Sequence, residues 1–223
     1  MFMKRFNRSN QNGAPNETAI IVKIQPGIVL AWALLTRRFS AVLIGAAVLA
    51  VAAAAATVVV GGIGVWQDYV ALLRNVSDPI TTPHNFTPGA TAYQAGLSAG
   101  VATTIQVASS AAAAAAVVVA ALRAKADASL LVAVVASQLL SPVLWDHYAM
   151  LLLLPVAWLL ERRRWWAAAI PLVTSAVTLF VDLPAAIYPV VFWIALIAVL
   201  WTGLREAAPR RPTEPIATPV SAG

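Results

Sequence analysis

Long apolar segments alternate with short polar connections along most of the chain. A helix that crosses a bilayer needs about 20 mostly apolar residues, and about 17 to 25 are tolerated. The sequence therefore predicts an all-α fold, a polytopic transmembrane helix bundle of about seven spans. The predicted spans are residues 18–35, 40–62, 100–122, 128–140, 148–160, 166–181 and 185–203.

The fourth and fifth predicted spans are shorter than the others and are separated by the segment "SPVLWDH". Either these helices continue into this corner or the bilayer is thinner there. Ser141 and Pro142 are expected to end the fourth helix, because proline lacks an N–H donor and restricts the residue before it. In the alanine-rich runs, small side chains predict close packing between helices.

Basic residues follow the first, third, fifth and seventh spans, so every second connection is basic. Membrane proteins keep an excess of Lys and Arg in their cytoplasmic connections. The pattern predicts a multi-pass plasma-membrane protein with a cytoplasmic C-terminus, and it accounts for ten of the 15 Lys and Arg residues. These ten are Arg37, Arg38, Arg123, Lys125, Arg162, Arg163, Arg164, Arg205, Arg210 and Arg211.

Composition supports this interpretation and narrows the possible chemistry. Hydrophobic residues make up 61% of the 223 positions and charged residues 11%, which is typical of a membrane protein and not of a soluble domain. The chain has no cysteine and two histidines, so no thiolate metal site is possible, and we expect neither a metal nor a cofactor. The net charge of +6 comes mainly from the ends of apolar segments, so the lipid bilayer is an expected partner and nucleic acid is not.

Three regions are expected. Residues 1–17 form a polar N-terminal tail, residues 18–203 a transmembrane domain with an outer loop at 63–99, and residues 204–223 a proline-rich cytoplasmic tail. The outer loop begins with "VWQDYVALLRN", whose apolar positions recur at helical spacing and predict an amphipathic helix on the membrane surface. Basic residues in the N-terminal tail conflict with its predicted outer location. Three interpretations are open: the chain is the C-terminal part of a longer membrane protein, its start is not native, or its topology is exceptional.

Lys23 lies within the first predicted span. A charge at the centre of a bilayer is costly, so an intramembrane lysine is a candidate functional residue. Two interpretations are open: Lys23 binds an anion such as a lipid phosphate, or its ammonium group reaches the outer interface.

Asp146 and His147 interrupt an otherwise apolar stretch at the predicted outer surface. In one interpretation they form a helix cap and an interfacial histidine, with Trp145 and Tyr148 as interfacial anchors. In the other, His147 binds a phosphate or a sugar hydroxyl and Asp146 orients it or accepts a hydrogen bond. Asp68, in the outer loop, is a further candidate, although surface carboxylates are usually only solvated.

Four segments resemble the C-terminal half of the glycosyltransferase family 87 membrane proteins, which are of the GT-C type. They are "VKIQPGIVLAWALLTRRF", "VWQDYVALL", "NFTPGATAYQAGL" and "SPVLWDHYAMLLLLPVAWLL". The resemblance covers about residues 19–202, and its most specific parts are the Lys-x-Gln-Pro and Ser-Pro-x-x-Trp-Asp-His segments.

The resemblance implies a hexosyltransferase that moves a sugar, mannose by family expectation, from a polyprenyl-phosphate donor to a glycolipid or glycan acceptor on the outer face. Lys23 and His147 would then bind the donor phosphate, with Asp146 in a catalytic role beside His147. The family's acidic first outer loop has no counterpart here, and Asp68 could supply the base only in a different architecture. The alternative is a non-enzymatic membrane protein, either a transporter-like module or an inactive truncated remnant.

Overall fold

The computed structural model describes residues 25–75, 79–82, 84–179 and 184–208, and all regular secondary structure in these ranges is helical. The α-helices are α1 (Gln25–Leu35), α2 (Phe39–Val60), α3 (Gly64–Asn75), α4 (Pro88–Gln94), α5 (Ala99–Arg123), α6 (Ala126–Leu139), α7 (Leu153–Glu161), α8 (Ala169–Leu179) and α9 (Ile187–Ala207). Short 3₁₀ helices are η2 (Pro79–Thr81), η3 (Asp146–Leu152) and η4 (Trp165–Ala168). The predicted all-α bundle is confirmed.

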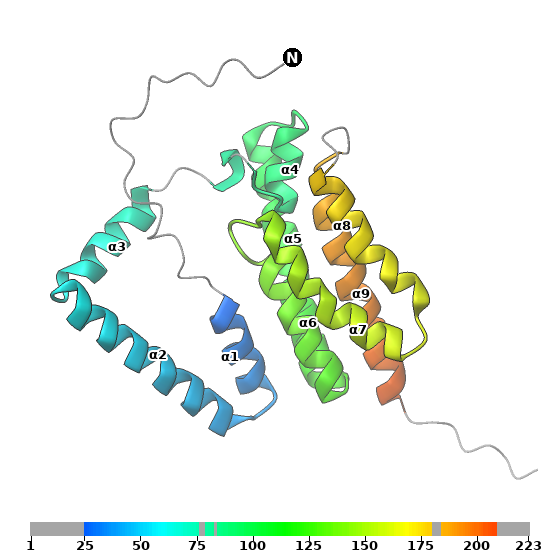
Figure 1. Cartoon of the computed structure of the whole chain (residues 1–223), viewed down its shortest axis with the longest axis horizontal. Coiled ribbons are helices and arrows are strands. Elements are labelled where there is room, and N and C mark those ends of the chain that lie inside the picture. The colour runs from blue at the N-terminus through cyan, green and yellow to red at the C-terminus, as the bar shows by residue number, and fades with distance from the viewer. Residues whose placement is uncertain (1–24, 76–78, 83, 180–183, 209–223) are drawn as a thin grey trace, which may run out of the picture.

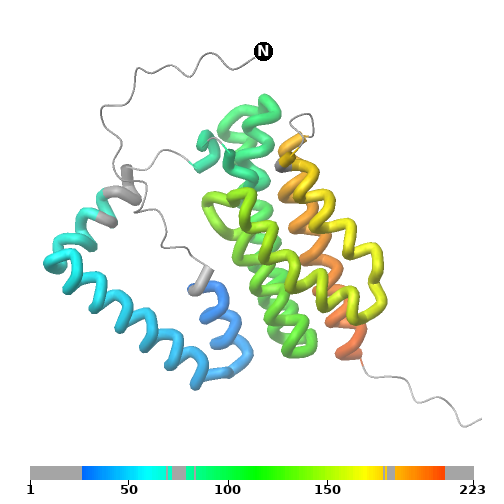
Figure 2. Tube along the Cα trace, in the orientation of Figure 1, coloured from blue at the N-terminus to red at the C-terminus, as the bar shows by residue number. Residues whose placement is uncertain are grey.

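Helices α5 to α9 form the main bundle, with α6 packed against α5, α9 and α1 (Figure 1). Helix α4 covers the N-terminal part of α5. Helices α2 and α3 extend away from the bundle, and α2 packs chiefly against α1 (Figure 2). The chain is therefore a compact bundle with a helical arm at one side.

Each predicted span overlaps a helical segment, the first one over residues 25–35, which are the part of that span that the structure describes. Helix η3 runs directly into α7, so the fifth segment is helical from Asp146 to Glu161, and it does continue into the corner. Helix α6 ends at Leu139, two residues before Ser141, as the proline predicted. The amphipathic segment is the helix α3. The predicted N-terminal tail and the end of the C-terminal tail lie outside the described residues.

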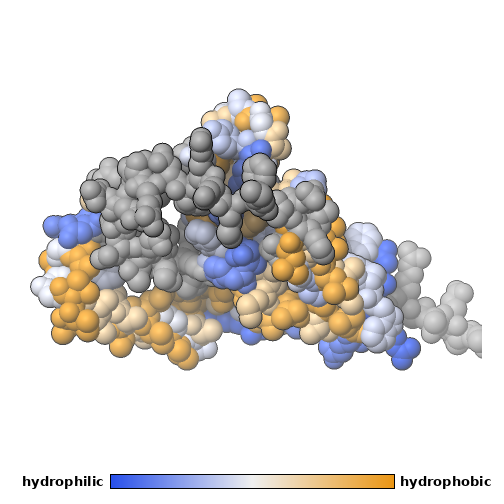
Figure 3. Space-filling model, turned by 45° about the horizontal axis from the view of Figure 1, so that its top comes forward, coloured by the Kyte–Doolittle hydropathy of each residue, from blue (hydrophilic) through white to orange (hydrophobic). Residues whose placement is uncertain are grey.

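Among the described helices, three are long and apolar enough to cross a membrane, namely α2, α5 and α9. Helix α2 buries no residue and exposes Leu43, Val51 and Val59 by 70%, 69% and 84%. Figure 3 shows a mainly hydrophobic surface over this arm and over much of the bundle. In a bilayer such side chains face lipid, which explains an apolar helix without protein cover.

Small and polar side chains join the bundle helices. Ala113, Ala116 and Ala120 are buried along one face of α5, as the alanine-rich run predicted. Indole N–H groups cross between helices: Trp32 on α1 donates to Ser129 on α6 at 3.0 Å, and Trp193 on α9 donates to Ser109 on α5 at 3.1 Å. Close approach and interhelical hydrogen bonds are the interactions that hold helices together in lipid.

The basic connections gather at one end of the bundle, which we call the basic end; it comprises the α1–α2, α5–α6 and α7–α8 turns and the C-terminus of α9 (Figure 1). There Arg162 donates to Asp127 at 2.9 Å and to Glu206 at 2.8 Å, joining three helices. Asp127 precedes the apolar part of α6, and its pKa is lowered by a hydrogen bond from Trp158 and by the charge of Arg162. The sequence predicted that these basic connections lie on one side of the membrane, and their position at one end of the bundle agrees with that prediction.

Candidate active site

The corner between α6 and η3, residues 140–147, carries the predicted Asp-His pair. It lies at the end of α6 that points away from the basic end (Figure 1). The Ser141 hydroxyl donates to the Val143 carbonyl at 2.7 Å, which closes a tight turn around Pro142. Leu144 is fully buried, and Asp146 then begins η3. The corner is therefore a packed connection and not a loose loop.

Asn85 fixes the first half of the corner. Its side chain is fully buried, and its amide donates to the carbonyls of Pro79 at 2.8 Å and Pro142 at 3.1 Å. Its Oδ1 accepts from the N–H groups of Thr87 at 3.1 Å and Leu144 at 3.0 Å. One side chain thus satisfies four backbone groups and ties the segment before α4 to the corner.

Tyr188, at the start of α9, fixes the second half. The hydroxyl of this fully buried residue donates to the carbonyl of Asp146, has the carbonyl of Trp145 at 3.2 Å, and accepts from the N–H of Ala149 at 3.1 Å. Its ring packs on Phe86 and Phe192, with centroid separations of 4.8 and 5.3 Å. The backbone that carries Asp146 is therefore held by a residue of α9 that lies 42 positions away in the sequence.

Asp146 and His147 project from this fixed backbone toward the surface. Their side chains are 59% and 60% exposed, and Asp146 Oδ1 lies 3.5 Å from His147 Nδ1. The same oxygen accepts from the His147 N–H at 2.8 Å. The imidazole ring packs edge-on against the Tyr148 ring, with a centroid separation of 4.4 Å. A carboxylate beside an imidazole can orient the ring.

A pocket of about 210 Å³ opens beside Asp146, between η3, the start of α7 and α8. Its other lining residues are mostly apolar or small: Ala149, Met150, Leu153, Pro171, Thr174 and Ser175. Asp146 therefore adds a charged residue to a mostly apolar lining. Among the described residues, no group of three His, Asp or Glu side chains is placed to hold a metal ion.

The remaining predicted site residues are not brought to this corner by the described structure. Asp68 is exposed on α3, in the arm that extends away from the bundle (Figure 1). Lys23 lies outside the described residues, so its pairing with His147 stays a prediction. Tyr148, expected as an interfacial anchor, is instead buried at 6% exposure, because it packs into the bundle core.

Sequence reasoning missed Asn85 and Tyr188. Asn85 stands in the quoted segment "NFTPGATAYQAGL", where an asparagine next to turn residues gave a signal only for a turn. Tyr188 stands at the start of an apolar run, where a tyrosine is most simply an interfacial residue. Only the packing of α9 against the corner shows what the hydroxyl binds.

Comparison with known proteins gives the class of the chain. The model of glycosyltransferase family 87 matches residues 18–144, which is more than half of the sequence. The match includes Asn85 and ends at Leu144, two residues before Asp146. No curated protein and no solved structure matched the chain. The chain belongs to glycosyltransferase family 87, and it is a helical membrane protein of the glycosyltransferase class.

Proposed function

We propose that this protein takes part in the transfer of a hexose, mannose by family expectation, from a polyprenyl-phosphate donor to a glycolipid or glycan acceptor on the outer face of the plasma membrane. Family membership supports glycosyl transfer, and the apolar helices support a substrate that resides in the bilayer. The donor, the acceptor and the membrane face are the parts that the proposal adds.

One observation carries the proposal: the Asp146–His147 pair sits on a fixed corner next to an apolar pocket. A polyprenyl phosphate has an apolar chain joined to an anionic head group, so its site must combine apolar and hydrogen-bonding surface at one place. The corner offers both within one turn of η3. Rigid support from Asn85 and Tyr188 suits a site that must hold reacting groups in a defined geometry.

In this proposal His147 hydrogen-bonds the phosphate oxygens and stabilises the negative charge that develops on the phosphate as its bond to the sugar breaks. Asp146, whose Oδ1 lies 3.5 Å from His147 Nδ1, orients the imidazole. Lys23 would add a second cation to the donor phosphate. The base that removes the proton from the acceptor hydroxyl is Asp146 or Asp68, and the corner favours Asp146, because this residue lines the pocket.

The test compares the two histidines of the chain in native-membrane proteoliposomes supplied with polyprenyl-phosphate-mannose. His147→Asn is expected to reduce mannose transfer about 100-fold, the usual effect of losing one side chain that stabilises developing charge. His84→Asn is the matched control, because His84 is exposed on the surface and its φ of 56° suits asparagine. Equal transfer by His147→Asn and the unaltered protein would remove the corner from the mechanism.

A further inference from the structure

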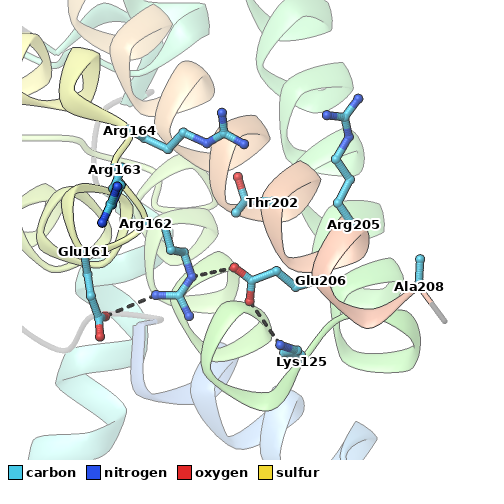
Figure 4. A pocket seen from close by; sticks show the side chains of 9 residues that line it. All are labelled: Lys125, Glu161, Arg162, Arg163, Arg164, Thr202, Arg205, Glu206 and Ala208. Atoms are coloured by element: carbon cyan, nitrogen blue, oxygen red, sulfur yellow. Dashed lines mark hydrogen bonds and ion pairs between the residues drawn. The ribbon is translucent and has the colours of Figure 1, made fainter. Parts of the chain in front are cut away.

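A second pocket, of about 680 Å³, lies at the basic end (Figure 4), and none of its lining residues belongs to the Asp-His corner. It is formed by the turn after α7, the C-terminal turn of α9, and Lys125 between α5 and α6. The proposed glycosyl transfer uses none of its residues. Its lining contains five cationic side chains and two carboxylates, a net charge of +3.

The two carboxylates of this pocket are already neutralised within the protein. Glu206 accepts from Arg162 at 2.8 Å and pairs with Lys125 at 3.3 Å. Glu161 pairs with Arg162 at 3.2 Å (Figure 4). Arg162 is also held by its own helix, since its guanidinium lies 3.7 Å from the Trp158 ring centroid. Arg162 and Lys125 therefore neutralise the two carboxylates, and these ion pairs join the ends of the helices around the pocket.

The other three cations, Arg163, Arg164 and Arg205, form no ion pair with any residue that the structure describes. Figure 4 shows Arg164 reaching across the pocket toward Thr202, with Arg205 on the other side of that threonine. A preference for basic residues on one side of a membrane explains their presence in these connections. It does not explain why these three arginines line a pocket in which both carboxylates already pair with Arg162 or Lys125.

Tryptophans place this pocket at the level of lipid head groups. Trp165 and Trp166 follow the arginine turn and are 70% and 50% exposed, and Trp201, one turn before Arg205, is 55% exposed. Arg205 stacks over the Trp201 ring at 4.4 Å. Exposed tryptophans at the ends of apolar helices mark the interface between head groups and acyl chains.

We propose that this pocket binds a phosphate group through Arg164 and Arg205, carried by an anionic membrane phospholipid or by free phosphate. Guanidinium groups bind phosphate oxygens with paired N–H donors, and basic pockets between helices at the inner interface are suited to anionic lipid head groups. A bound phosphate would bridge the α7–α8 turn and the end of α9. The site would thereby add to the contacts that Arg162 already makes between these elements.

The test measures binding of phosphatidylglycerol to the purified full chain in detergent by native mass spectrometry. Arg164→Gln/Arg205→Gln is expected to weaken binding about 30-fold, the effect of losing two cations near a phosphate. Arg37→Gln/Arg123→Gln removes the same charge from exposed positions at the basic end outside the pocket, and we expect less than about a threefold change. Equal weakening by the two double variants, or none by the first, would overturn the proposal.

Two further arms separate the source of the phosphate from effects on folding. Millimolar inorganic phosphate or pyrophosphate that displaces the lipid would identify free phosphate as the ligand, whereas retention of the lipid would identify the head group; both results support the site. Arg164→Lys/Arg205→Lys keeps the charge but lacks the paired N–H donors, so it should bind more tightly than the glutamine variant and less tightly than the unaltered protein. If this variant binds as weakly as the glutamine variant while its thermal unfolding is unchanged, charge is not what the pocket supplies, and the proposal fails.

Discussion

The Tyr188 hydroxyl joins α9 to the backbone that carries Asp146 and His147. Tyr188→Phe removes only this hydroxyl and leaves the N–H of Ala149 without its partner in a packed region. A buried backbone group without a hydrogen bond costs about 1 to 3 kcal/mol. We therefore expect the free energy of unfolding to fall by about 2 kcal/mol, measured by denaturant unfolding in detergent.

Sugar transfer should fall as well in Tyr188→Phe, through a lower kcat, because the Asp146 backbone loses its anchor while the side chains of the pair are intact. Tyr93→Phe is the control: Tyr93 is 39% exposed on α4, where its hydroxyl can reach solvent. If Tyr188→Phe and Tyr93→Phe unfold at the same denaturant concentration and transfer at the same rate, Tyr188 does not position the corner.

Residues of the candidate site differ in how far the sequence revealed them. Asp146 and His147 were visible because two polar residues interrupt an apolar stretch. Asn85 and Tyr188 were not, since their roles come from contacts across 59 and 42 positions of sequence. A single sequence carries periodicity and local turn chemistry, and it does not show which distant backbone groups a buried side chain will meet.

At the scale of elements, hydrophobic patterning located the helices well. The ends of α2, α5 and α6 lie within two residues of the predicted spans, because length and apolarity alone set these boundaries. The 3₁₀ segments η3 and η4, which precede α7 and α8, were not predicted. Tight i to i+3 hydrogen bonds depend on how a corner packs, and the apolar pattern does not distinguish them from an α-helical start.

Packing between α6 and α9 depends on Gly203. A Cβ added at Gly203 would overlap the Cβ of Ala128 on α6. Alanine stabilises a helix by about 1 kcal/mol relative to glycine. The sign of the change in the free energy of unfolding therefore shows whether this helix propensity or the overlap with Ala128 is the larger effect. We expect Gly203→Ala to lower the free energy of unfolding by about 1 to 3 kcal/mol, the usual cost of overpacking, measured by denaturant unfolding.

Gly100→Ala gives the opposite expectation in the same assay. Gly100 lies in the first turns of α5 with nothing within 4 Å of an added Cβ. Here only helix propensity acts, so the substitution should be neutral or stabilising by up to about 1 kcal/mol. A stabilising Gly203→Ala would mean that α6 and α9 are further apart than this packing requires.

The whole molecule has two chemically different ends, and the proposals depend on which end faces the cytoplasm. Direct ion pairs place the α5–α6 turn, the α7–α8 turn and the end of α9 together. The Asp-His corner and α4 lie toward the other end of the bundle (Figure 1). Positive charge favours the cytoplasmic side, so the corner should face outward.

The absence of cysteine makes this orientation directly measurable, because a single introduced cysteine is the only thiol in the chain. We expect a membrane-impermeant maleimide added to intact cells to label Leu97→Cys, which lies 45% exposed near α4, and to leave Ala126→Cys unlabelled. Ala126 is exposed at the basic end, and its thiol should react only after the membrane is permeabilised. The reverse labelling pattern would mean that the basic end faces outward. The Asp-His corner would then meet cytoplasmic donors, and the phosphate pocket would face outward, so this one measurement decides on which side of the membrane the corner meets its donor.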